Sequence, residues 1–106
     1  MVVFGAGDLG SLFLEHLKTS SDEYYPKLRV LGFLDETRVL HGRQLRSFKV
    51  LGDLSCVPRL VKDEGLKGIV LAIRKPRQDL LDQLAELADE HGLKIYRWQV
   101  GVEEMG

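Results

Sequence analysis

Apolar and polar positions along the chain form blocks that predict strands and helices in alternation. Five short apolar or alternating segments bounded by turn residues are typical of buried strands: residues 2–4, 28–34, 48–51, 68–73 and 93–98. Between them, apolar residues recur at spacings of three and four, which predicts helices over residues 8–18, 54–64 and 77–91. Pro58 suits a first helical turn, and Gly92 suits a C-terminal cap.

The order of these segments predicts the fold class. Polar stretches over 19–27 and 36–47 are expected to be loops. Strands that alternate with helices pair in parallel through right-handed crossovers. We therefore expect an α/β, Rossmann-like domain with an open parallel sheet of five strands, order 3-2-1-4-5, and helices on both faces. The 106 residues fit one domain over 1–106, and the abrupt ends of the pattern suggest that it is cut from a larger protein.

A glycine-rich turn joins the first strand to the first helix with the sequence Gly5-Ala6-Gly7-Asp8-Leu9-Gly10. In such a turn Gly5 permits the bend, Gly7 leaves room for a phosphate beside the backbone, and Gly10 lets the helix pack close to the sheet. The helix N-terminus then offers amides and a partial positive charge to an anion. The alternative is a turn that binds nothing, although Gly7 has little purely structural purpose. We expect Asp8 to cap the helix.

Asp35 ends the second predicted strand, where dinucleotide sites place an acid that accepts hydrogen bonds from the adenosine ribose. A carboxylate there would repel a 2′-phosphate, so it favours NAD over NADP. The alternative is a solvated turn residue.

Two basic segments follow the second and fourth strands, and their residues are Arg38, Arg43, Arg46 and Lys49, then Arg74, Lys75 and Arg77. Since ligands of open α/β sheets bind outside the carboxyl ends of the strands, both segments are expected to border one site. Arginine is suited to bidentate phosphate contacts, so Arg43 and Arg74 are candidates to contact a dinucleotide, coenzyme A or a nucleotide sugar. The alternative is that these are solvated loop charges.

Composition narrows the function classes. The net charge is −1, which we interpret as excluding nucleic acid as a partner and membrane contact by this segment. One cysteine, Cys56, cannot form an internal disulfide, and this fits a cytoplasmic protein. The three histidines lack metal-ligand spacing, and no nucleophile elbow or acid–base pair is present, so we expect neither a metal site nor catalysis by this domain alone.

Four segments carry a resemblance to a known family: residues 2–10, 31–35, 41–54 and 68–73. They resemble the N-terminal, CoA-binding-like nucleotide-binding domain of bacterial polysaccharide-biosynthesis proteins. These proteins are membrane-associated nucleotide-sugar epimerases/dehydratases and polyprenyl-phosphate sugar-phosphate transferases. Redox-sensing repressors that bind NADH have a similar core, with a comparable glycine turn and a Phe-x-Asp pattern. This chain has no winged-helix segment, so a complete repressor is not expected.

The resemblance implies a role for each matching residue. The glycine turn would hold the pyrophosphate, Asp35 would meet the adenosine ribose, and Ala72 and Ile73 would line the site. The family commonly has a small residue or proline next, whereas here Arg74-Lys75-Pro76 follows, which leaves the nicotinamide side undefined. NAD is the expected cofactor, with coenzyme A or another adenine nucleotide as alternatives. A regulatory sensor module and a degenerate domain used for oligomerisation, as a homo-oligomer or with a partner domain, are the competing interpretations.

Overall fold

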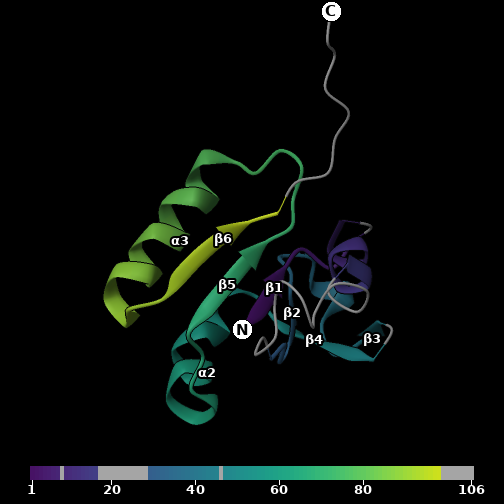
Figure 1. Ribbon diagram of the computed structural model, residues 1–106, viewed down its shortest axis with the longest axis horizontal. Helices are drawn as coiled ribbons and strands as arrows, with labels where there is room; N and C mark the ends of the chain where they lie inside the picture. The colour runs from purple at the N-terminus through teal and green to yellow at the C-terminus, as the bar shows by residue number, and fades with distance from the viewer. Residues whose placement is uncertain (8, 17–28, 46, 99–106) are drawn as a thin grey trace, which may run out of the picture.

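The computed structural model describes residues 1–7, 9–16, 29–45 and 47–98. In this part of the chain six strands form one sheet in the order β3-β4-β2-β1-β5-β6 (Figure 1). Their bounds are β1 (Val2–Phe4), β2 (Gly32–Leu34), β3 (Gln44–Leu45), β4 (Phe48–Gly52), β5 (Gly68–Leu71) and β6 (Lys94–Arg97). The helical segments are residues 9–16, the 3-10 helices η1 (Arg38–Leu40) and η2 (Leu54–Cys56), and the α-helices α2 (Val57–Glu64) and α3 (Gln78–His91).

The parallel part of the sheet confirms the expected fold class and order. β1 lies between β2 and β5, with Val2 paired to Gly32 on one side and to Ile69 on the other. β4 extends the sheet beyond β2, and β6 extends it beyond β5, both in parallel. Because β1, β2 and β5 are parallel, their carboxyl ends lie at the same end of the sheet. Strand order reverses at β1, the central strand of the three.

The strand count was wrong by one, because β3 comes from a segment expected to be a loop. β3 is antiparallel to β4, with Gln44 opposite Lys49 and Leu45 opposite Phe48. Only two residues of β3 are paired, and two residues are too few to form a periodic apolar pattern in the sequence. A second difference is the length of β2, which was expected over 28–34 but pairs with β1 only over Gly32–Leu34.

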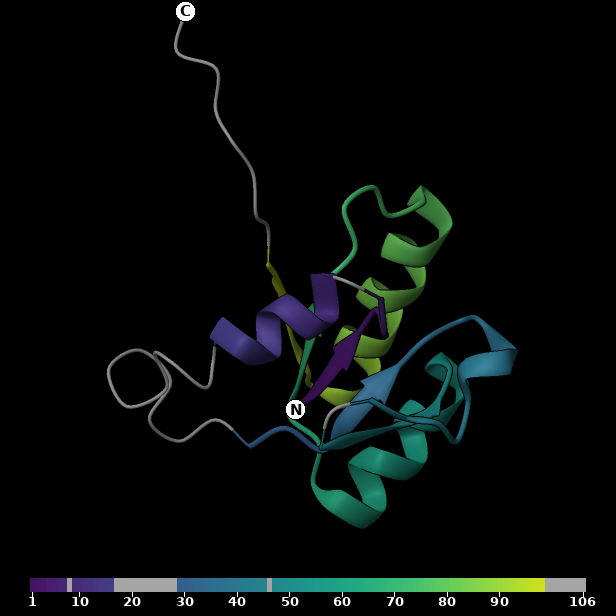
Figure 2. The ribbon, with the colours of Figure 1, turned by 90° about the vertical axis from the view of Figure 1, so that its right-hand side faces the viewer.

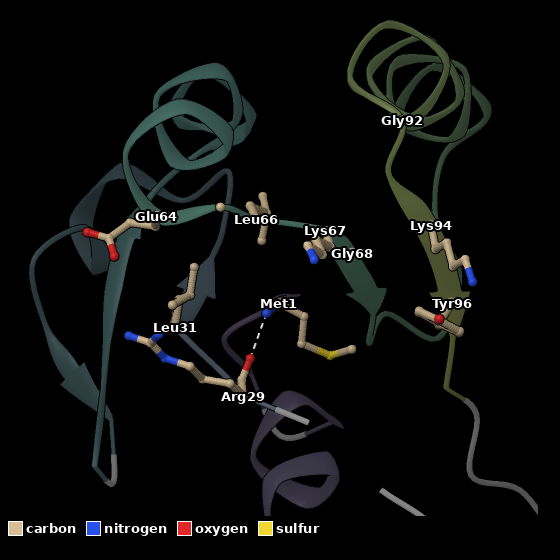
Figure 3. A pocket seen from close by; sticks show the side chains of 11 residues that line it. Met1, Arg29, Leu31, Glu64, Leu66, Lys67, Gly68, Gly92, Lys94 and Tyr96 are labelled. Atoms are coloured by element: carbon tan, nitrogen blue, oxygen red, sulfur yellow. Dashed lines mark hydrogen bonds between the residues drawn. The ribbon is translucent and has the colours of Figure 1, made fainter. Parts of the chain in front are cut away.

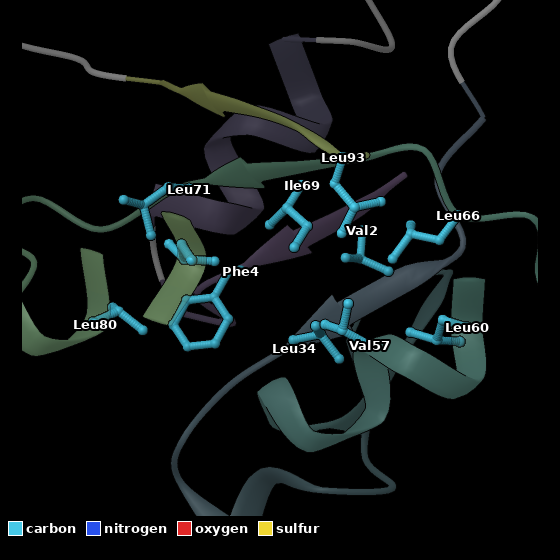
Figure 4. Close-up of a cluster of buried hydrophobic side chains, with 11 residues drawn as sticks. Val2, Phe4, Leu34, Val57, Leu60, Leu66, Ile69, Leu71, Leu80 and Leu93 are labelled. Carbon is cyan, nitrogen blue, oxygen red and sulfur yellow. The ribbon is translucent and has the colours of Figure 1, made fainter. Parts of the chain in front are cut away.

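Both faces of the sheet are covered, which explains why the central strands are apolar throughout. Residues on successive positions of β1 point to opposite faces: Val2 and Phe4 pack against α2 and α3, and Val3 packs against the helix over residues 9–16. Figure 2 shows this helix on the opposite side of the sheet from α2 and α3. The larger cluster is drawn in Figure 4.

The start of α2 and the end of α3 agree with the sequence prediction. Pro58 lies in the first turn of α2, and Gly92 ends α3 in the left-handed region with φ of 67°. No helix among the described residues is long and apolar enough to cross a membrane. The loop expected over 19–27, together with Asp8 and Arg46, lies outside the described residues.

Candidate functional site

The glycine turn lies where the carboxyl ends of β1, β2 and β5 meet. The Gly5 amide donates to the Leu34 carbonyl over 2.8 Å, and the Ala72 amide donates to the Phe4 carbonyl over 2.9 Å. Gly5 has φ of 114°, and a Cβ there would lie 2.5 Å from the Ala72 carbonyl oxygen. The turn therefore lies in close contact with the ends of β2 and β5. Only glycine fits the first position of the turn.

The other two glycines of the turn have different surroundings. A Cβ on Gly10 would overlap the carbonyl oxygen of Gly5, so Gly10 allows the helix to approach the turn. A Cβ on Gly7 would have no atom within 4 Å, and Gly7 is exposed without a left-handed backbone. Close packing therefore requires Gly10, whereas nothing inside the described molecule requires Gly7.

The helix over residues 9–16 directly follows the glycine turn. The Ser11 amide donates to the Gly7 carbonyl over 3.1 Å, which begins the helical hydrogen bonding. The amides of Leu9 and Gly10 lie in that first turn, where no intrahelical acceptor is available. The side chains of Ala6 and Leu9 are buried in the core, so these residues offer only backbone groups to a ligand.

Asp35 ties the end of β2 to the glycine turn. Its Oδ2 accepts from the Ala6 amide and its Oδ1 accepts from the Thr37 amide, each over 2.8 Å. Burial raises the pKa of the Asp35 carboxyl, but hydrogen bonds from Ala6 and Thr37 and the charge of His41 outweigh this and hold its pKa below the ordinary value. The carboxylate is therefore ionised at neutral pH and positioned against the turn.

His41 also contacts Asp35, a contact that sequence reasoning missed. Its Nε2 lies 2.7 Å from the Asp35 carbonyl oxygen. A carbonyl only accepts, so Nε2 carries the proton in this contact. η1 folds the chain back so that His41 reaches Asp35, and the His41 amide donates to the Arg38 carbonyl over 3.0 Å. Asp35 and His41 are six residues apart in a polar stretch, and the sequence has no periodic pattern there that would predict their contact.

The residues that follow β5 include two predicted to line the site and two predicted basic residues. Ala72 and Ile73 lie beside Gly5, and the exposed Arg74 follows them directly. Arg77 is paired with Glu36 over 2.7 Å and with Asp79 over 3.0 Å, so acids already compensate its charge.

Arg43 is remote from the glycine turn. Its carbonyl accepts from the Val50 amide at the β3–β4 edge of the sheet. Val50 is level with Phe33, which is level with Val3, so the backbone of Arg43 lies three strand spacings, about 14 Å, from β1. The structure does not bring Arg43 and Arg74 together, and we keep the predicted phosphate contact for Arg74 alone.

Among the described residues, a cavity lies at each end of the strands. The larger, about 640 Å³, lies at the amino ends of the strands beside Met1, Gly68 and Lys94 (Figure 3). The smaller, about 330 Å³, lies at the carboxyl edge, and its lining residues are Glu36, Asp53, Leu54, Ser55 and Gln83. Glu36, which lines the smaller cavity, directly follows Asp35 in the sequence. Within the described residues, no three His, Cys, Asp or Glu side chains are grouped to hold a metal ion.

Solved structures share this fold. The chain is similar to a Rex-family repressor, RSP, and to RSP in complex with beta-NADH, at 19% identity and TM-scores of 0.70 and 0.71. The match covers 98–99% of this chain and 47–48% of the repressor, so the chain spans about half the repressor's length. UDP-D-quinovosamine 4-dehydrogenase from Vibrio fischeri matches at 18% identity and TM-score 0.70, over 92% of this chain and 75% of the enzyme. No protein-family model and no curated protein matches the chain.

These structures share a Rossmann-like fold with this chain, and one of them corrects an expectation. RSP in complex with beta-NAD+ and operator DNA matches over 97% of this chain at 20% identity and TM-score 0.69. The exclusion of nucleic acid was therefore wrong, since a domain of this fold occurs within a repressor bound to DNA. The net charge of −1 is therefore not a sufficient ground for excluding nucleic acid. None of these descriptions names coenzyme A.

Proposed function

We propose that this chain binds NAD(H) across its glycine turn and serves as the nucleotide-sensing module of a regulatory protein. The observation that carries the proposal is the contact of the Asp35 carboxylate with the Ala6 amide, beside the open backbone at Gly7. The contact holds the acid and the turn in fixed relation before any ligand binds. Such preorganisation lowers the entropic cost of binding.

Each part of a dinucleotide then has a matching group. The pyrophosphate would lie against Gly7 and the amides of the first helical turn, where the helix dipole favours negative charge. An ionised carboxylate has roughly four acceptor positions, so Asp35 retains capacity for a ribose hydroxyl beyond the amides that it already binds. We propose that the adenine binds in the cavity lined by Glu36 and Asp53, since Glu36 directly follows Asp35.

The regulatory role is supported by the similarity to a repressor described in complex with beta-NADH. Around the glycine turn, the described residues offer a ligand one charged acid and backbone amides. A second candidate is a binding domain of a nucleotide-sugar biosynthesis enzyme. The similarity to UDP-D-quinovosamine 4-dehydrogenase favours it, together with the sequence resemblance to polysaccharide-biosynthesis proteins.

Thermal shift with a panel of ligands tests the proposal and separates the candidates. A ligand at 100 times its dissociation constant stabilises the folded state by about 2.7 kcal/mol, which for a domain of this size raises Tm by roughly 10–20 °C. We expect NADH and NAD+ to give such shifts, and NADPH, coenzyme A and ATP to give smaller ones at equal concentration. A shift with UDP-sugars and none with NADH would support the biosynthetic candidate instead.

A further inference from the structure

We propose that the cavity at the amino ends of the strands binds a small aromatic anion, at a second site separate from the glycine turn. The cavity has a volume of about 640 Å³, which lies within the usual range for small-molecule sites. Asp35 follows the carboxyl end of β2, so this cavity lies at the other end of the sheet. The inference therefore does not rest on the proposed NAD(H) function.

The chain enters β5 and β6 through the same sequence, Gly-Leu-Lys, at residues 65–67 and 92–94. In each copy the glycine caps the preceding helix in the left-handed region, with φ of 66° and 67°, and the leucine is buried. The lysine of each copy is exposed and lines the cavity, and the Lys94 amide donates to the Lys67 carbonyl over 3.0 Å. The repeated turn therefore places the backbones of two lysines side by side at this end of the sheet.

Positive charge predominates in the lining of the cavity. Arg29 joins the two lysines there, and Glu64 is the one acid among the described lining residues. Figure 3 shows Arg29 on one side of the opening and Lys94 on the other. None of the three cations forms an ion pair with any residue that the structure describes. Like charges on neighbouring strands repel one another, and a bound anion would compensate them.

The lysines have a competing explanation that needs no ligand. They follow the carboxyl ends of α2 and α3, where a positive charge stabilises the helix dipole. This explanation does not account for Arg29, which precedes β2 and follows no described helix, or for the aromatic wall of the cavity. The two explanations make different predictions for the lysine variants described below.

Tyr96 is the aromatic wall of the cavity, and its side chain is 47% exposed. Gly68 lies beside it on β5 and has no left-handed backbone, so its φ does not require glycine. A Cβ on Gly68 would lie 3.4 Å from Cε2 of Tyr96 and 3.2 Å from the Lys94 carbonyl oxygen. Glycine therefore leaves room for the ring beside β5. A planar ligand would stack on the exposed part of Tyr96 while its anionic group reaches the lysines.

These features define the chemistry of the ligand. The cations favour a phosphate or a carboxylate, and Tyr96 favours an aromatic body attached to it. Phenyl phosphate and benzoate are suitable probes, and they distinguish the two kinds of anion. Inorganic phosphate lacks the ring and benzyl alcohol lacks the charge, so each control removes one of the two proposed interactions.

The test is a titration of the ¹⁵N-labelled chain followed by amide chemical shifts. We expect phenyl phosphate to shift the signals of residues 66–68 and 94–96 saturably, with a dissociation constant on the order of 1 mM for so small a ligand. Benzoate carries a single charge and should bind more weakly at the same residues. Inorganic phosphate and benzyl alcohol should bind at least about tenfold more weakly than phenyl phosphate, and added salt should weaken phenyl phosphate binding.

Variants separate the two interactions. Lys67→Ala and Lys94→Ala should each weaken phenyl phosphate binding by about threefold to tenfold, whereas Lys49→Ala, an exposed lysine on β4, should leave it unchanged. Tyr96→Ala should weaken binding of phenyl phosphate and leave that of inorganic phosphate unaltered. The side chains removed are exposed, so their loss spares the core, and melting curves verify that each variant is folded.

Three results would overturn the site: no saturable shift with phenyl phosphate or benzoate, shifts spread equally over exposed cations such as Lys49, or wild-type affinity in the Lys67→Ala/Lys94→Ala double variant. A lower Tm of that double variant without any binding by wild type would support the helix-dipole explanation instead. An NADH titration of the same labelled protein is followed at residues 5–11. Absence of NADH shifts there would overturn the proposed function and leave the amino-end site standing.

Discussion

Replacing Gly7 by alanine separates the ligand-binding role of the glycine turn from its structural role. An added Cβ at Gly7 meets no atom within 4 Å, and the backbone there does not have positive φ. Alanine also restricts the unfolded chain, so we expect the free energy of unfolding to change by no more than about 1 kcal/mol. The methyl group would nevertheless occupy the space through which a phosphate approaches the backbone. We expect NADH affinity to fall by at least about tenfold, which is 1.4 kcal/mol.

Gly10→Ala is the matched control in the same turn. Its Cβ would overlap the Gly5 carbonyl oxygen and lie 3.1 Å from Cε1 of Phe33, so backbone must move to admit it. Overpacking typically costs about 1–3 kcal/mol, and because backbone must move here we expect about 3 kcal/mol, which lowers Tm by roughly 12–24 °C in a domain of this size. We expect this variant to lose stability and affinity together.

Chemical denaturation gives the free energy of unfolding, and NADH titration of the folded variants gives the affinity. We expect Gly7→Ala to keep the free energy of unfolding of the wild type and to lose affinity for NADH. A Gly7→Ala protein that binds NADH as tightly as wild type would refute the assignment of the phosphate to this position. A loss of about 3 kcal/mol in Gly7→Ala, as large as that expected from overpacking at Gly10, would refute the description of its surroundings.

Further substitutions test the acid, the basic residues and the core. The lowered pKa of Asp35 means that its carboxylate stabilises the fold above about pH 4 and that this stability is lost as pH falls through the folded pKa, so Asp35→Asn should flatten the acid limb of Tm against pH. The same variant should narrow the preference for NADH over NADPH in titrations. Arg74→Ala should weaken NADH binding severalfold and reduce its salt dependence, whereas Arg43→Ala, three strands from β1, should change neither. Leu84→Ala, 1% exposed in the larger cluster, should cost about 2–5 kcal/mol in urea unfolding, and a cost below about 1 kcal/mol would contradict the packing described.

Most of the fold could be predicted because its elements are encoded locally. The apolar run at β5 and the three- and four-residue spacing in α3 each indicate one element, and alternation of strands with helices leaves few topologies. β3 could not be predicted, since two residues paired through Gln44 and Leu45 have no pattern of their own. The length of β2 was also predicted wrongly. A strand extends only as far as its neighbour pairs with it, and β1 pairs with only three residues of β2.

The candidate site was predicted in part for the same reason. Gly5, Gly10 and Asp35 stand at positions fixed by strand ends, so the sequence alone places them together. The contacts of His41 with Asp35 and of Arg77 with Glu36 depend on how loops fold back, and loop geometry has no period. Of the two basic segments, Arg77 is paired with Glu36 and Asp79, and the backbone of Arg43 lies at the β3–β4 edge of the sheet.

The central claim is that this chain binds a dinucleotide at the glycine turn, and direct titration with NADH tests it. Calorimetry or the change in nicotinamide fluorescence gives the dissociation constant, with NADPH as the competitor that differs by one phosphate. We expect saturable binding of NADH at one site per chain and at least about tenfold weaker binding of NADPH, because Asp35 would repel the 2′-phosphate. Absence of saturable NADH binding, or tighter binding of NADPH, would contradict it.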